Sequence, residues 1–135
     1  MRPMPTYVID GRDFSTLEEF YDEFNRVLVP EPWGRNLDAF NDVLRGGFGT
    51  ADGGFILEWR NSGLSRERLG YPETVSQLER RLSRCHPENR GSVAAKLELA
   101  RKGVGPTVFD CLVEIIQAHG KGGVESEDNV ELRLC

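Results

Sequence analysis

The sequence has few of the residues from which metal sites, disulfide frameworks and reactive centres are built. It contains three cysteines and two histidines in 135 residues, and it has no Cys-x-x-Cys pair. An odd number of widely spaced cysteines argues against a disulfide framework and fits a reducing compartment. Cys85-His86 is the only close pair of cysteine and histidine in the chain, so we expect no zinc site.

Long apolar runs are also missing. No segment approaches the roughly 18 consecutive apolar residues from which a membrane-spanning helix is built. The first residues, Met1 to Tyr7, lack the apolar core of a secretory signal. We therefore expect a cytoplasmic protein that makes no contact with a membrane.

Basic residues are fewer than acidic ones. The 17 Lys and Arg residues are outnumbered by 22 Asp and Glu residues, and the net charge is −5. Such a chain is a poor partner for nucleic acid and a better one for a basic protein, because opposite fields steer association. Its length and its 39% hydrophobic content predict one domain over residues 1–135 with a single core.

The chain does contain a series of short elements with clear periodicity. Residues 6–9, 55–59 and 130–134 are rich in strand-forming residues, and the middle run is typical of a strand buried on both faces of a parallel sheet. Apolar residues at helical spacing predict helices between these runs, among them 16–28 and 106–119. The order predicts an α/β fold, a small three-stranded parallel sheet packed with helices.

Residues 71–104 read as additional helical material. Apolar residues recur at helical spacing from Thr74 to Leu82, and Ser92 is a candidate cap for a second helix that ends before Gly103. The basic cluster 80–86 has two interpretations, contact with an acidic surface and a solvated face. We expect this segment to pack at one end of the sheet, away from the central helix described next.

The stretch 30–46 combines a rigid loop with a short helix. Two prolines restrict the loop backbone, and Gly34 permits a tight bend. Asn36 is a good helix N-cap, and Gly46 stands where a helix C-terminus favours glycine. The sequence therefore predicts a helix between these two residues.

This helix has an apolar side and an acidic side. Leu37, Phe40 and Leu44 fall at i, i+3 and i+7 and form one apolar stripe. Asp38 and Asp42 are four residues apart, so both carboxylates rise from one side. Like charges at this spacing destabilise a helix by about 0.2–0.5 kcal/mol, and the dipole disfavours an anion near the C-terminus. The two aspartates have two interpretations, a solvated polar face of the helix and a functional site.

Catalysis has little support in the sequence. An acid/base pair of Asp38 and Asp42 in a small α/β enzyme is one hypothesis, but no nucleophile lies near them in the chain. The glycine-rich run 46–54 lacks the Gly-Lys-Ser/Thr ending of a phosphate-binding loop and precedes a strand. His119 has no obvious catalytic partner, so we expect it to cap the last helix. We expect no enzyme, no catalytic residue, no cofactor and no metal.

The segment Trp33-Gly34-x-Asn36-Leu37-Asp38-Ala39-Phe40-x-Asp42 resembles the central motif of the barstar family. Tyr7-Val8-Ile9-Asp10-Gly11 before it and Leu57-Glu58-Trp59 after it also match, in the right order. The helix 106–119 and the terminal strand complete the family layout. The resemblance covers residues 6–69 and 105–135, which makes residues 71–104 an apparent expansion.

The resemblance implies an intracellular inhibitor that blocks the active site of a secreted, guanyl-specific microbial ribonuclease in a 1:1 complex. It implies that the second helix and the preceding loop make the contact, and that the free protein is a monomer. An immunity protein for another nuclease toxin and a scaffold that binds another basic protein are alternatives. The predicted partner-binding residues are Trp33, Gly34, Arg35, Asn36, Asp38, Ala39, Asn41, Asp42, Arg45, Gly46 and Gly47.

Three positions depart from the family pattern. Pro32 and Asn41 stand where family members carry aromatic contact residues. The family's acidic contact in the last helix falls near Ile115, and Glu114 is the nearest carboxylate in the chain.

Overall fold

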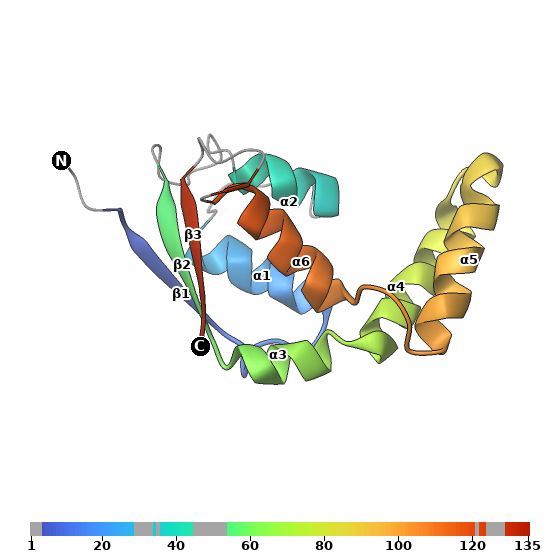
Figure 1. Ribbon diagram of the computed structural model, residues 1–135, viewed down its shortest axis with the longest axis horizontal. Helices are drawn as coiled ribbons and strands as arrows, with labels where there is room; N and C mark the ends of the chain where they lie inside the picture. The colour runs from blue at the N-terminus through green and yellow to red at the C-terminus, as the bar shows by residue number, and fades with distance from the viewer. Residues whose placement is uncertain (1–3, 29–33, 35, 45–53, 121, 124–128) are drawn as a thin grey trace.

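The computed structural model describes residues 4–28, 34, 36–44, 54–120, 122–123 and 129–135. Its elements follow the predicted order and confirm the α/β class (Figure 1). In chain order they are β1 (Thr6–Asp10), α1 (Leu17–Val27), α2 (Leu37–Leu44), β2 (Phe55–Arg60), α3 (Ser62–Arg68), α4 (Tyr71–Arg84), the 3₁₀-helix η1 (Pro87–Asn89), α5 (Arg90–Arg101), α6 (Val108–Ala118) and β3 (Val130–Leu134).

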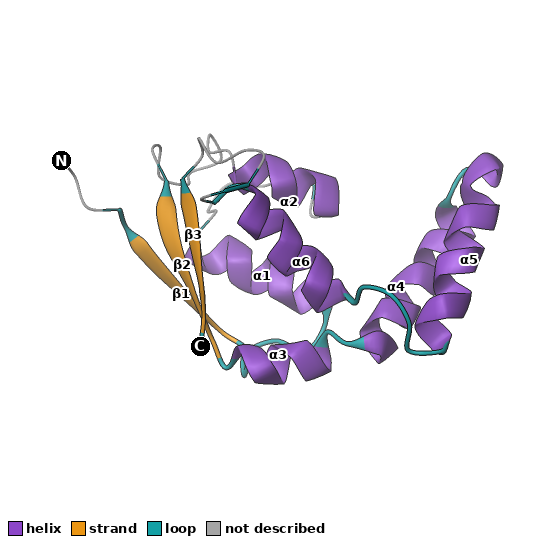
Figure 2. Ribbon diagram, viewed as in Figure 1, coloured by secondary structure: helices purple, strands orange, loops and turns teal. Residues whose placement is uncertain are grey.

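The three strands form one parallel sheet, as predicted, and their order within it is β1-β2-β3. Ile9 of β1 lies opposite Trp59 of β2, which lies opposite Leu134 of β3. Figure 2 shows α1, α2 and α6 together on one side of the sheet. These helices cover the face that carries the large apolar side chains of β2.

The prediction that β2 is buried on both faces is wrong. Its residues alternate, with Phe55, Leu57 and Trp59 buried, while Glu58 is half-buried and Arg60 is exposed. Glu58 and Arg60 form an ion pair of 2.6 Å on the side of the strand that does not face the core. Glu58 interrupts the run of apolar residues, and with Arg60 two positions later it was the signal in the sequence for a polar outer face.

Aromatic rings dominate the core between the sheet and the helices. The ring of Trp59 lies 5.3 Å from that of Phe20 on α1 and 5.2 Å from that of Phe109 on α6. Phe40 of α2 contacts Phe24 of α1 with 4.9 Å between the ring centroids. All five rings are essentially inaccessible to solvent, so the core joins α1, α2 and α6 to the central strand.

Residues 71–104 are helical, as predicted, and α4 and α5 form a helical hairpin. Its own apolar seam includes the buried residues Val93, Leu97 and Ala100 of α5. Helix α5 begins at Arg90, before the predicted cap at Ser92. The N-cap of α5 is Asn89, the last residue of η1, and its side chain makes no capping hydrogen bond.

The base of the α4–α5 hairpin is tied to the N-terminal ends of two core helices. The backbone N–H of Leu17 on α1 donates to the Glu73 carboxylate at 2.6 Å, and that of Val108 on α6 donates to Thr74 Oγ1 at 2.9 Å. Arg80 of the basic cluster pairs with Glu18 at 2.7 Å. The hairpin therefore docks on the helical layer and not on the end of the sheet, and Figure 1 shows it standing apart from α2.

Glu73→Ala is expected to lower the free energy of unfolding by about 1–3 kcal/mol, because it leaves the buried N–H of Leu17 without its acceptor. The matched control is Glu79→Ala on the same helix, whose carboxylate is exposed and lies 3.9 Å from Arg101. Loss of such a surface pair should change stability by less than about 1 kcal/mol. Urea denaturation of both variants measures the difference, and equal losses would contradict a structural role for Glu73.

Candidate protein-binding site

Helix α2 begins with the predicted N-cap. The backbone N–H of Ala39 donates to Asn36 Oδ1 at 2.8 Å, which satisfies one of the four free N–H groups at the start of a helix. The helix then runs from Leu37 to Leu44. The predicted C-terminal glycine, Gly46, lies outside the described residues.

The inner side of α2 is fixed to the core. Phe40, Val43 and Leu44 are buried, and Leu37 packs partly buried against the same cluster. A helix of eight residues is unstable by itself in water, so its conformation depends on this packing. The helix is therefore a rigid platform only as part of the folded chain.

The outer side of α2 carries the two aspartates singled out by the sequence. Asp38 and Asp42 are both exposed, while the intervening Phe40 is completely buried. Gly34 and Asn36 just before the helix are exposed as well. The structure thus presents two carboxylates on the surface of a helix whose opposite side is buried in the core.

The other predicted contact residues divide into two groups. Ala39 and Asn41 are half-buried on α2. Five lie outside the described residues: Trp33, Arg35, Arg45, Gly46 and Gly47. The partner-binding role of all eleven stays a prediction.

Asn41 makes a contact that the sequence did not predict. Its Oδ1 lies 2.6 Å from Nε2 of His119, at the end of α6. His119 is the C-cap residue of α6, as predicted, but its backbone N–H makes the capping contacts and its side chain is completely buried. Nothing local in the sequence could reveal the pairing, because 78 positions separate the two residues.

On α6, Glu114 is exposed and its neighbour Ile115 packs partly buried against the core. Glu114 is therefore a surface carboxylate on a helix adjacent to α2. Cys111 of the same helix, Cys85 and Cys135 are all free thiols. In the part of the chain that the structure describes, no cluster of His, Cys, Asp and Glu could hold a metal ion, and no helix is long and apolar enough to cross a membrane.

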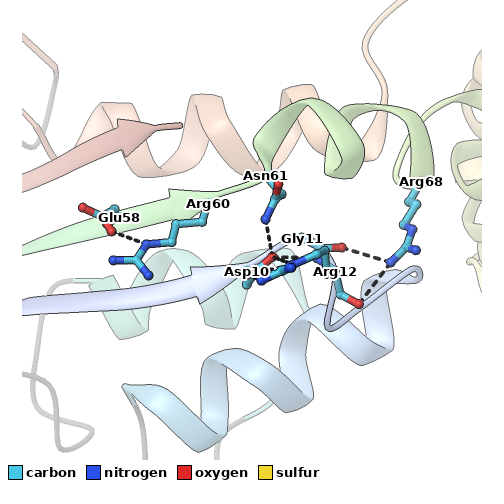
Figure 3. Close-up of polar contacts among 7 residues, drawn as sticks. All are labelled: Asp10, Gly11, Arg12, Glu58, Arg60, Asn61 and Arg68. Carbon is cyan, nitrogen blue, oxygen red and sulfur yellow. Dashed lines mark hydrogen bonds and ion pairs between the residues drawn. The ribbon is translucent and has the colours of Figure 1, made fainter.

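A second group of polar residues gathers where β1 and β2 end, the edge at which many α/β proteins bind ligands. Figure 3 shows Asp10 at its centre, with both carboxylate oxygens directed at Arg12. Asn61 donates to Asp10 at 2.8 Å, and Arg68 donates to the carbonyls of Gly11 and Phe14. The group joins the two loops that follow β1 and β2.

The space around Gly11 explains why a glycine follows Asp10 where the two loops meet. A Cβ at this position would lie 2.4 Å from Ser65 Oγ and 2.5 Å from the Asn61 carbonyl oxygen, so only glycine fits. The hydrogen bonds from the Arg12 side chain and backbone, together with the one from Asn61, hold the pKa of Asp10 well below its ordinary value. The Asp10-Gly11 pair of the motif is thus explained by the fold, and its polar groups are satisfied within the chain.

Asp10→Asn is expected to lower the melting temperature at pH 7, because it removes the charge that these donors stabilise. Since the pKa of Asp10 is lower in the folded state, its ionised form contributes stability above the unfolded value of about 3.9. That contribution is lost progressively as the pH falls from this value toward the lower pKa of the folded state, so the difference from wild type should be smaller at pH 3 than at pH 7. Asp13→Asn, at an exposed position nearby, is the control. A difference that does not depend on pH would contradict the assignment.

Two comparisons connect this architecture to known proteins. A family model described as "Barstar (barnase inhibitor)" matches residues 4–109. A protein of Bacillus subtilis (strain 168) named "Putative ribonuclease inhibitor YrdF" is 46% identical over 44 residues, which cover 32% of this chain and 48% of that protein. The chain thus matches about half of the relative's length.

The family match spans most of the elements described above. It includes β1, α2, β2 and the α4–α5 hairpin, and it ends in the first turn of α6. It therefore runs through residues 71–104, which the resemblance had set aside as an expansion. The matched range, the parallel sheet and the central helix agree, and the chain belongs to the barstar family.

Proposed function

We propose that this protein is a cytoplasmic inhibitor of a secreted, guanyl-specific ribonuclease, whose active site it blocks in a 1:1 complex with α2 and the preceding loop. The observation that carries the proposal is the exposure of Asp38 and Asp42 on a helix whose other side is packed into the core. The family description names a barnase inhibitor and the relative's printed name refers to a ribonuclease inhibitor, and both support the same role.

The chemistry of the target explains the acidic helix. A ribonuclease must stabilise the negative charge of a phosphate and of the phosphorane formed from it, so its active site is cationic. Carboxylates held on a rigid helix can occupy the positions of phosphate oxygens and accept charge-assisted hydrogen bonds from arginine, lysine or histidine. The inhibitor then blocks the site without reacting.

The same observation disfavours an acid/base role for Asp38 and Asp42. Enzymes place such pairs in sites that exclude water, where electrostatic interactions are strong. Both aspartates here are exposed on the outer side of α2. Binding to a cationic surface requires carboxylates that are exposed in the free protein. Water is then excluded from them by the partner when the complex forms.

Titration of purified protein against a panel of ribonucleases tests the proposal. We expect the activity of a guanyl-specific member to fall linearly and to vanish at one equivalent of inhibitor. The association rate should decrease with added salt, because a chain of charge −5 meets a cationic cleft. A ribonuclease that cleaves without guanine preference is the control for specificity. Full activity of every panel member at large excess of inhibitor would refute the proposal.

A further inference from the structure

Helix α2 is held by two kinds of contact. On one side Phe40 and Val43 pack into the core, where the Phe40 ring meets those of Phe20 and Phe24. On the other, the Asn41 side chain meets the buried imidazole of His119. A hydrogen bond is directional, so this second contact restricts the rotation of the helix about its axis.

The imidazole is a firm anchor because its own backbone is held twice. The N–H of His119 donates to the carbonyl of Ile116 on α6 at 3.1 Å, and its carbonyl accepts from Val130 of β3 at 2.9 Å. The next residue, Gly120, has no room for a side chain, since a Cβ there would lie 2.6 Å from the Val130 carbonyl oxygen. His119 is therefore fixed between the last helix and the last strand.

The chemistry of the two side chains sets the direction of the hydrogen bond. The amide oxygen of Asn41 can only accept, so the contact is a hydrogen bond in the His119 tautomer that carries the hydrogen on Nε2. The hydrogen on Nε2 that this bond requires can be observed directly by NMR.

The position of Asn41 connects this bond to the acidic side of α2. Asn41 is three residues after Asp38 and directly before Asp42, at the boundary between the buried and exposed sides. A rotation of the helix that broke the bond would turn both carboxylates together. We propose that His119 is a positioning residue for partner binding, which acts through Asn41 to hold Asp38 and Asp42 in one orientation. This inference rests on the proposed function.

The test compares two substitutions of the same residue. His119→Leu removes the donor and retains an apolar side chain, while His119→Gln keeps an amide donor that can reach Asn41. In His119→Leu we expect backbone amides of α2 to exchange with solvent about three- to tenfold faster relative to those of α1, as loss of one hydrogen bond implies. Affinity for the ribonuclease should fall by up to about tenfold, because binding must reorient the helix. His119→Gln should restore both quantities.

Thr74→Val is the control, since it removes the buried hydrogen bond at the opposite end of α6 together with the one that Thr74 Oγ1 donates to the carbonyl of Gly70. It should lower global stability without changing the relative exchange of α2 or the affinity. In the wild-type protein, the Nε2 hydrogen should give a nitrogen-15 NMR signal in slow exchange with water. The double variant Asn41→Ala/His119→Leu should bind no more weakly than Asn41→Ala alone, because both changes remove the same bond.

The proposal is overturned if His119→Leu and Thr74→Val have the same effects, if a folded His119→Gln restores nothing, or if Nε2 carries no hydrogen. Should His119→Leu fail to fold, Asn41→Ala at the half-buried partner and the NMR signal decide the matter. Failure of the wild-type protein to inhibit any ribonuclease refutes the proposed function instead. In that case, exchange of α2 in the free protein still tests whether His119 orients the helix.

Discussion

Asp42→Ala is expected to weaken binding to the cognate ribonuclease by about 2–5 kcal/mol, and by more than Asp38→Ala does. Removal of one member of a buried, hydrogen-bonded charge pair leaves the other charge without its counterion. Losses of binding energy of this size result, and the known examples include barstar complexes themselves. In the complex the Asp42 carboxylate should accept such bonds from arginine or histidine in a pocket from which water is excluded.

The ranking of the two aspartates follows from their places on α2. Asp38 lies in the first turn, where the positive end of the helix dipole favours an anion, so the fold itself tolerates it. Asp42 lies near the last turn, where the dipole and the carboxylate of Asp38 both disfavour it. A carboxylate that local helix energetics disfavour has the stronger claim to a role with the partner.

Thermal melts and titration calorimetry on both alanine variants decide this prediction. Asp42→Ala should leave the free protein equally or slightly more stable, within about 0.5 kcal/mol. Glu114→Ala on α6 serves as a third variant, and a loss of affinity there would identify the additional acidic contact. An Asp42→Ala protein that is clearly destabilised but retains near-native affinity would show that this carboxylate serves the fold.

Phe40→Ala is expected to lower the free energy of unfolding by about 3–5 kcal/mol, the usual range for removal of a buried aromatic ring. The Phe40 ring is completely buried and meets the rings of Phe20 and Phe24 edge to face. The substitution therefore opens a cavity at the point where α2 meets α1. Because α2 is too short to be stable alone, inhibition should be lost together with its packing.

Two variants at and near this position serve as controls. Phe40→Leu keeps most of the buried surface and should cost clearly less than Phe40→Ala. Leu37→Ala, on the same helix but only half-buried, should also cost less. Urea denaturation gives the stabilities, and activity titration gives the inhibitory fraction. Phe40→Ala with near-native stability would show that the ring does not fasten α2 to the core.

The sequence by itself determined the features that depend on neighbouring residues. Apolar residues three and four positions apart predicted α1, α2 and α6, and Asn36 acts as the expected cap because capping links a side chain to a backbone N–H only a few residues away. The placement of Asp38 and Asp42 on the solvent side follows from the same helical period. The three strands could likewise be predicted, since each is a short run with its own pattern, whereas their order within the sheet came from the structure.

Only the tertiary structure decided what depends on residues far apart in the chain. It showed that Asp10 joins two loops through Arg12 and Asn61, and that the hairpin is tied to α1 and α6. It also brought His119 against Asn41 across 78 positions. No local period encodes such contacts, because which distant groups meet is set by how the helices pack on the sheet, and that packing depends on the whole core at once.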